Sequence, residues 1–266
     1  MSLPLPKAKK SLGQHFLVDG HYIARIVAAI RPDAGDTMVE IGPGPGALTR
    51  PLLDKLPHLH VVELDRDMVA RLQAEFPPQR LSIHQADALD FDFSQIACPP
   101  GDQLRVVGNL PYNISSPLLF HLAESADRIR DMCFMLQKEV VDRMAAAPDT
   151  ADYGRLSVML QARFRVEKLF VVPPGAFRPP PKVDSAIVRL TPLPPEAIPY
   201  RDARVFADVV SRAFGQRRKT LRNTLKGLVD AALFEELGID PIRRGETLSV
   251  AEFAALANRL SRLAMP

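Results

Sequence analysis

The stretch Val39-Glu40-Ile41-Gly42-Pro43-Gly44-Pro45-Gly46 decides the fold, because a short apolar run leads directly into three closely spaced glycines. Glycine lets the chain turn tightly and lets a ligand approach the backbone with no Cβ atoms in the way. The apolar run predicts a buried strand over 37–41, and the glycines predict a ligand-binding turn that leads into a helix.

A glycine turn of this kind is also compatible with a dinucleotide. Two details favour a cofactor without phosphates. Glu40 places an acid just before the turn, and Pro43 and Pro45 remove N–H groups that a pyrophosphate would bind.

Two acids follow at the ends of the next strands. Glu63 closes a predicted strand over 59–64, where an acid of a nucleotide-binding sheet grips ribose hydroxyls. Asp87 follows a third strand over 81–84 and is placed to accept a hydrogen bond from an adenine amine. An isolated Asp also fits a helix cap, but its place after Gly42 and Glu63 favours the site.

A fourth strand over 104–107 ends at Gly108-Asn109-Leu110-Pro111-Tyr112. The N6 lone pair of adenine is delocalised, and two acceptors, the Asn109 side-chain oxygen and the Leu110 carbonyl, can turn it toward an electrophile. Pro111 stiffens the turn, and Tyr112 offers a ring for base stacking worth about 1–3 kcal/mol. An ordinary strand-to-helix turn uses the same residue types, but the upstream motifs favour methylation of a base amine.

Strands continue to alternate with helices, at 132–136, 168–172 and 185–190. This alternation predicts an α/β Rossmann-like fold with a seven-stranded, mostly parallel sheet. Asp65 is expected to cap the helix after the second strand, and Ser116 to cap the helix after the fourth. Asp65 and Asp67 can also be read as exposed acids beside the helix that follows the second strand.

The C-terminal part is predicted to be a small all-helical domain after a Pro-rich linker over 192–199. Apolar stripes predict one helix through Val205 to Phe214 and another through Leu221 to Val229, and Ser249 with Glu252 forms a capping box.

Positive charge is concentrated in this C-terminal part. The chain of 266 residues has a net charge of +3, but residues 201–226 carry +6 and the rest −3. Such asymmetry indicates a polyanion contact, with a solvated helix face as the alternative. The candidate RNA-binding residues are Arg217, Arg218, Lys219 and Arg222.

Several classes are not indicated. No apolar run approaches the ~20 residues that span a bilayer, and no apolar signal core follows the N-terminal lysines, so we expect a cytoplasmic protein without a membrane partner. Cys98 and Cys133 lack metal or redox spacing and the histidines show no metal-binding cluster, so no metal is expected. No apolar stripe is left over, which favours a monomer.

In this order the motifs resemble those of class I S-adenosylmethionine-dependent methyltransferases. More specific are Gly-Gln-His-Phe-Leu at 13–17, Asn-Leu-Pro-Tyr-Asn-Ile-Ser-Ser-Pro-Leu at 109–118, Phe-Arg-Pro-Pro-Pro-Lys-Val-Asp-Ser at 177–185 and Phe-Gly-Gln-Arg-Arg-Lys-Thr-Leu-Arg-Asn at 214–223. Together they resemble the ribosomal RNA adenine dimethyltransferases, in particular the bacterial small-subunit family linked to kasugamycin resistance, over nearly the whole chain.

The resemblance implies S-adenosylmethionine as cofactor and, as substrate, two adjacent adenosines in the 3′-terminal hairpin loop of 16S rRNA within the 30S subunit. It implies a basic arm over 1–20, a methyltransferase domain over 21–195 and a helical RNA-binding domain over 196–266. The implied cofactor-binding residues are Gln14, His15, Leu17, Gly42, Gly44, Glu63, Asp87, Ala88 and Asn109.

The family usually has Asn where this chain has His15, and an imidazole can donate a hydrogen bond to the methionine carboxylate and respond to pH. Phe177 matches the family's second aromatic, which would sandwich the target base against Tyr112; packing within its loop is the alternative.

Two other functions remain open at the level of sequence. One is a 23S rRNA or DNA adenine methyltransferase, which shares Asn-Leu-Pro-Tyr. The other is a non-catalytic ribosome-assembly factor that kept the fold; the intact set of Gly42, Glu63, Asp87 and Asn109 favours catalysis.

Overall fold

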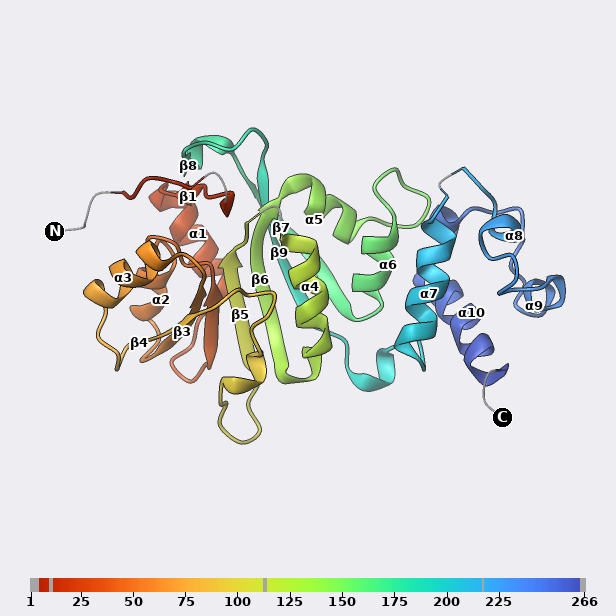
Figure 1. Cartoon of the computed structure of the whole chain (residues 1–266), viewed down its shortest axis with the longest axis horizontal. Helices are drawn as coiled ribbons and strands as arrows, with labels where there is room; N and C mark the ends of the chain where they lie inside the picture. Colours follow the sequence, from red (N-terminus) through yellow and green to blue (C-terminus); the bar gives the residue numbers. More distant parts are fainter. Residues whose placement is uncertain (1–4, 10–11, 112–113, 217, 264–266) are drawn as a thin grey trace. The chain divides into compact units, whose positions relative to one another are not determined.

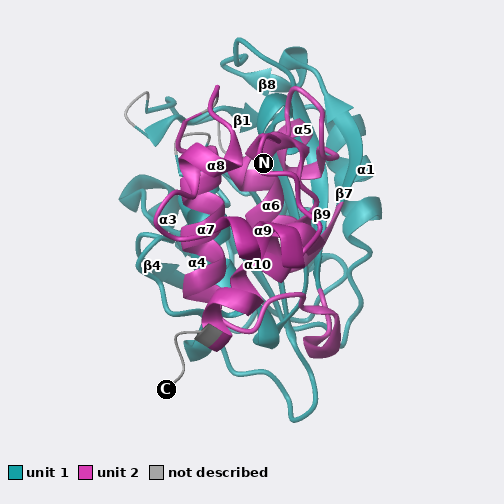
Figure 2. Ribbon diagram, turned by 90° about the vertical axis from the view of Figure 1, so that its right-hand side faces the viewer, with its two compact units in different colours: residues 1–141, 167–192 teal, residues 142–166, 193–266 magenta. Residues whose placement is uncertain are grey.

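The computed structural model describes residues 5–9, 12–111, 114–216 and 218–263. The chain forms two compact units, coloured separately in Figure 2. Unit 1 consists of Met1–Val141 and Glu167–Pro192, and unit 2 of Asp142–Val166 and Leu193–Pro266. Each unit has its own apolar core.

Unit 1 contains a seven-stranded sheet in the order β4-β3-β2-β5-β6-β9-β7; all of these strands except β2 are labelled in Figure 1. The strands from β4 to β6 pair in parallel, and β9 pairs antiparallel with β6. This confirms the predicted Rossmann-like α/β fold. The strands are β2 (Met38–Ile41), β3 (Leu59–Glu63), β4 (Leu81–Gln85), β5 (Leu104–Asn109), β6 (Ile129–Gln137), β7 (Phe164–Val172) and β9 (Ser185–Pro192).

The helices beside these strands are α1 (Gly20–Ile30), α2 (Thr49–Leu53), α3 (Arg66–Glu75), α4 (Ser115–Glu124) and α5 (Lys138–Ala145). Helices α2, α3 and α4 form the crossovers from β2 to β3, from β3 to β4 and from β5 to β6, while α1 precedes β2 and α5 follows β6. Helices α1, α2 and α3 bury Ile26, Leu52 and Leu72 in one cluster with Met38 and Val61 of the sheet. Because all parallel strands end at one edge, the loops that follow them meet there.

A second, two-stranded sheet joins the N-terminal arm to the Pro-rich loop over residues 173–181. Strand β1 (Phe16–Leu17) pairs antiparallel with β8 (Phe177–Arg178), with Leu17 opposite Phe177. The sequence did not predict this pairing, because a strand of two residues shows no periodicity.

The helix starts were predicted with mixed success. Asp65 caps α3, since its side chain accepts from the Asp67 N–H at 3.0 Å, as expected. The expectation that it is exposed was wrong, because Asp65 is 2% exposed. Ser116 as a cap was also wrong: α4 begins at Ser115, and Ile114 holds the N-cap position without a side-chain hydrogen bond.

Unit 2 is helical. Its helices are α6 (Arg155–Gln161), α7 (Ala203–Phe214), α8 (Leu221–Thr224), α9 (Ala231–Glu236) and α10 (Val250–Leu263). The predicted capping box is present, because Glu252 accepts from the Ser249 N–H at 2.8 Å while Ser249 Oγ accepts from the Glu252 N–H at 3.2 Å. The second stripe does not form one long helix, since α8 ends at Thr224, although Leu225 and Val229 are buried.

Unit 2 also includes residues 142–166, which the sequence interpretation grouped with the α/β part. Val158 and Ala162 lie in its core, and the Tyr153 hydroxyl donates to the Leu248 carbonyl at 2.9 Å. Among the described residues, no helix is long and apolar enough to cross a membrane.

Candidate cofactor and adenine site

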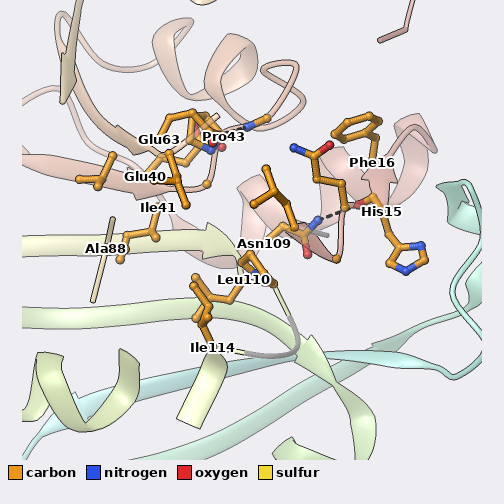
Figure 3. A pocket seen from close by; sticks show the side chains of 18 of the residues that line it. His15, Phe16, Glu40, Ile41, Pro43, Glu63, Ala88, Asn109, Leu110 and Ile114 are labelled. Atoms are coloured by element: carbon orange, nitrogen blue, oxygen red, sulfur yellow. Dashed lines mark hydrogen bonds between the residues drawn. The ribbon is translucent and has the colours of Figure 1, made fainter. Parts of the chain in front are cut away.

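A pocket of about 280 Å³ opens in unit 1 where β2, β3, β4 and β5 end (Figure 3). This size is near the lower end of small-molecule pockets, about 300–1,000 Å³. It brings together, from four strand ends and the arm, the predicted residues Gln14, His15, Leu17, Gly42, Gly44, Glu63, Asp87, Ala88, Asn109, Leu110 and Pro111.

The glycine turn forms one wall of the pocket. Gly42 and Gly44 have φ values of 65° and 52°, a left-handed conformation that L side chains rarely adopt. The Gly42 N–H donates to the Val62 carbonyl at 2.9 Å, which fixes the turn against the end of β3. The turn therefore needs glycine at both positions.

Glu63 is held at the end of β3 by backbone donors. The Gly44 N–H donates to Oε2 at 3.1 Å, and the Asp65 N–H donates to Oε1 at 2.8 Å. Burial raises the pKa of Glu63 above its ordinary value, and these hydrogen bonds oppose that shift. Each carboxylate oxygen can accept a second hydrogen bond, so the pair can receive the two hydroxyls of a ribose.

Glu40 is a second buried acid of the pocket, only 2% exposed. The Thr49 hydroxyl donates to its Oε2 at 2.6 Å. Burial raises the pKa of Glu40 to about 7, and the nearby Glu63 adds to the shift, while the Thr49 hydrogen bond and the charge of Arg50 oppose it. Ionised Glu40 is therefore an unfavourable state that a cationic ligand would stabilise.

Asp87 lies in the loop after β4. Its Oδ1 accepts from the Leu89 N–H at 2.9 Å, which orients the side chain as in an Asx turn. Ala88 and Ile114 add apolar surface to the same pocket. This combination of an acceptor and apolar walls suits an adenine ring with an exocyclic amine.

Asn109 ends β5 with its amide held in one orientation. Its Nδ2 donates to the His15 carbonyl at 3.2 Å, a contact drawn in Figure 3. A carbonyl only accepts, so the nitrogen faces the arm and Oδ1 is the acceptor that faces the opposite way. The Leu110 N–H donates to the Met135 carbonyl at 3.1 Å, which fixes the following peptide.

The arm contributes the His15 carbonyl to the site, while the His15 and Gln14 side chains bind elsewhere. The His15 ring points away from Glu63 and Asn109 in Figure 3, and its Nδ1 donates to the Pro179 carbonyl at 2.9 Å. The Gln14 amide donates to Asp65 at 2.8 Å. The proposed contact between His15 and a cofactor carboxylate stays a prediction.

The aromatic pair is only partly described. Phe177 is fully buried in the core of unit 1 and does not line the pocket. In this conformation the loop-packing alternative describes its ring. Tyr112 lies outside the described residues.

The basic residues lie in unit 2, between α7 and the end of α8. Arg218, Lys219 and Arg222 are exposed, and Arg217 lies outside the described residues. Among the residues that the structure describes, no group of three or more His, Cys, Asp and Glu is placed to hold a metal ion.

The sequence did not predict that Lys9 and Gln14 bind Asp65. Lys9 Nζ lies 2.6 Å from Asp65, and Gln14 binds the other oxygen of the same carboxylate. The partners are separated by 56 and 51 residues, so no local pattern reveals the contacts.

The donor set fits S-adenosylmethionine, a cation with a ribose and an adenine. Acids with raised pKa values face a pocket that also has polar residues such as Asp87 and Asn109 and apolar walls, and the two prolines of the glycine turn offer no N–H groups to a pyrophosphate.

Residues 6–262 match the family model described as ribosomal RNA adenine dimethylase. The chain is 60% identical over 255 residues to "Ribosomal RNA small subunit methyltransferase A" of Aromatoleum aromaticum, covering 96% of this chain and 95% of that one. It is 61% identical to the protein of the same name from Thiobacillus denitrificans, covering 95% and 98%.

The fold is similar to that of two solved structures. A dimethyladenosine transferase from Plasmodium falciparum has a TM-score of 0.79 at 26% identity, covering 93% of this chain and 98% of that one. The 23S rRNA methyltransferase ErmE has a TM-score of 0.69 at 26% identity, covering 92% and 99%. With a family model matched over almost its whole length, the chain belongs to the ribosomal RNA adenine dimethylase family.

Proposed function

We propose that this protein transfers methyl groups from S-adenosylmethionine to N6 of two adjacent adenosines in the 3′-terminal hairpin loop of 16S rRNA within the 30S subunit. The single observation that carries the proposal is the Asn109 amide, tied through its nitrogen to His15 with its oxygen left as an acceptor. The identity of about 60% to small-subunit methyltransferases favours this substrate.

The strand ends hold the cofactor. Glu63 accepts hydrogen bonds from the ribose hydroxyls, and Asp87 accepts one from the adenine amine. Gly42 and Gly44 let the backbone approach the cofactor closely. When bound, S-adenosylmethionine supplies an electrophilic sulfonium methyl group. Glu40 and Glu63 are ionised in the complex, because a cation nearby favours the charged form of a buried acid.

The acceptor side orients the target base. Asn109 Oδ1 and the Leu110 carbonyl accept from the N6 hydrogens and turn the nitrogen lone pair toward the methyl group. The amine becomes acidic only as the new bond forms, so no side chain with a tuned pKa is required, and positioning accounts for most of the rate.

The base reaches the pocket by unstacking, which costs little in a hairpin loop. Tyr112 stacks on it, and Phe177 joins only if its loop moves, because the ring is now buried. The second transfer needs room for the methylated amine to rotate, so the base cannot be held rigidly.

Unit 2 holds rRNA phosphates through Arg217, Arg218, Lys219 and Arg222, as an RNA-binding domain. Phosphate contacts of this kind make binding strongly dependent on salt. The protein acts as a cytoplasmic monomer.

The test is methyl transfer from labelled S-adenosylmethionine to 30S particles that lack the modification, compared with naked 23S rRNA and duplex DNA. The labelled base is identified after nuclease digestion. N6,N6-dimethyladenosine from the 3′-terminal hairpin supports the proposal. Transfer only to 23S rRNA or DNA indicates the other methyltransferases, and tight 30S binding without transfer indicates an assembly factor.

A further inference from the structure

The N-terminal arm is tied to the first turn of α3 by a cluster that we call the arm latch: Lys9, Gln14 and Asp65. Lys9 Nζ lies 2.6 Å from Asp65 Oδ1, and Gln14 Nε2 donates to Asp65 Oδ2 at 2.8 Å. The Lys9 N–H donates to Gln14 Oε1 at 2.8 Å, which closes the arm on itself. Both oxygens of one carboxylate thus hold the arm.

The arm latch lies between the two halves of the site. On one side, the Asp65 N–H donates to Glu63, the acid at the ribose position, at 2.8 Å. On the other side, the arm continues from Gln14 to His15, whose carbonyl accepts from Asn109 at 3.2 Å. A short path of peptide bonds and hydrogen bonds therefore joins the cofactor side to the acceptor side.

His15 lies between two anchors of the arm. The β1–β8 pairing fixes the chain from Phe16 onward, and the Val18 N–H donates to the Ala176 carbonyl at 2.9 Å. The arm latch fixes the chain just before His15. If that anchor is lost, the chain before His15 is released while Phe16 and the His15 ring stay held, and the His15 carbonyl can shift relative to the Asn109 amide.

We propose that Asp65 is a positioning residue for methyl transfer, which acts by holding Lys9 and Gln14 and thereby fixing the carbonyl that orients the Asn109 amide. The inference rests on the proposed function of the site. A displacement of about 1 Å in a reacting group can cost about 100-fold in rate, so a small movement of the arm is enough.

Lys9 contacts two aspartates, and we expect only the buried one, Asp65, to contribute to holding the arm. The Asp65 side chain is fully buried, whereas that of Asp67, which also contacts Lys9 at 2.6 Å, is 72% exposed. Exposed ion pairs contribute little, while a buried carboxylate depends on each of its donors. Asp67 is therefore the matched control for Asp65.

The main variant is Asp65→Asn. Asparagine retains an oxygen to cap α3 but loses the charge that attracts Lys9 and one of the two acceptors. We expect kcat on 30S particles to fall by about 10- to 100-fold, with KM for the particles within about threefold of wild type. Lys9→Met should lower kcat in the same way, and Lys9→Arg should largely restore it.

Two controls separate the latch from helix capping. Asp67→Asn should leave kcat unchanged. Asp202→Asn changes an N-cap residue of α7 in unit 2 that makes the same kind of cap without an arm contact, and it should also leave kcat unchanged. Equal losses in Asp65→Asn and Asp202→Asn would overturn the proposal.

Hydrogen exchange gives a readout that does not depend on activity. In Asp65→Asn, amides of residues 12–17 should exchange faster, while those of α3 should be unchanged. Combining Asp65→Asn with Asn109→Ala should cause no loss beyond that of Asn109→Ala, because both act through one amide.

The outcomes distinguish this inference from the proposed function. A wild-type chain that transfers no methyl group overturns the proposed function and this inference with it. An active wild type with an equally active Asp65→Asn variant overturns this inference alone. A loss of kcat without faster exchange over residues 12–17 also overturns it.

Discussion

Buried charged side chains have different partners at the two ends of β5. At the amino end, Arg105 is buried and binds Asp36 at 2.6 Å and Asp131 at 2.7 Å, so a charged side chain meets opposite charges. At the carboxyl end, where Asn109 lies, the buried acid Glu63 accepts from backbone N–H groups and Glu40 from a hydroxyl. Both acids have raised pKa values.

This difference distinguishes charged residues that stabilise the fold from charged residues that bind a ligand. A buried ion pair is neutralised within the chain, so removing one partner is costly. A buried acid that meets only neutral donors keeps an unfavourable charge that a cation can stabilise. Variants at the amino end should therefore affect folding, and variants at the carboxyl end should affect binding and catalysis.

The largest effect is expected at the amino end. Arg105→Met leaves the buried Asp36 and the half-buried Asp131 without their main partner and should lower the free energy of unfolding by about 3–5 kcal/mol. Arg130→Met, whose side chain is 50% exposed beside Asp36, should cost less than about 1 kcal/mol. Urea unfolding at pH 7 measures both, and similar losses would remove the distinction between the buried and exposed partners.

At the carboxyl end, Asn109→Ala should lower kcat by about 100- to 1,000-fold, because an acceptor that orients the reacting amine is lost. The melting temperature should stay unchanged, and 30S binding should remain within about threefold. Gln103→Ala, which removes an amide bonded to the Asp127 carbonyl near the amino end of β5, is the control and should keep full activity. Equal losses of binding and turnover in Asn109→Ala would contradict the assigned role.

Glu40→Gln should stabilise the ligand-free protein at high pH. Burial raises the pKa of Glu40 to about 7 in the folded protein, above its ordinary value, so its contribution to stability is complete at acidic pH and is lost as pH rises through about 7. The variant should be more stable than wild type by up to about 3 kcal/mol at pH 8 and equal to it near pH 4.

Thermal or urea unfolding across this pH range measures the effect of Glu40→Gln. Glu124→Gln, which changes a carboxyl that is 81% exposed, serves as the control and should show no such dependence. A Glu40→Gln variant that is less stable than wild type at pH 8 would contradict the conclusion that burial disfavours ionised Glu40.

The smallest effect is expected at His15. Its side chain donates to Pro179, and its carbonyl, which any residue supplies, holds Asn109. His15→Ala should therefore change KM for S-adenosylmethionine by less than about threefold. If KM for S-adenosylmethionine rises more than tenfold in His15→Ala and returns to the wild-type value in His15→Asn, the side chain binds the cofactor directly.

Much of the fold follows from local pattern. All seven strands of the large sheet were predicted, because each contains an apolar or an alternating stretch between turns or helices. The strand-end residues Gly42, Glu63, Asp87 and Asn109 were expected near one another, since parallel strands share a carboxyl edge, and they do line one pocket.

What the sequence did not reveal depends on long-range contacts. Asp65 fitted an exposed acid because its partners Lys9 and Gln14 lie more than 50 residues away. Phe177 is buried because its loop pairs with the arm, and residues 142–166 pack into unit 2 through Tyr153 and Val158. In each case a distant segment, rather than the local pattern, decides burial.

The measurement that bears most directly on the contrast between the two ends is calorimetry of S-adenosylmethionine binding at pH 6.5 in phosphate and in Tris. If the pocket acids ionise to meet the cationic cofactor, binding releases protons, the apparent enthalpy differs between the buffers, and the difference shrinks in Glu40→Gln. An enthalpy that is the same in both buffers for the wild-type protein would show that binding does not ionise these acids, which contradicts the account.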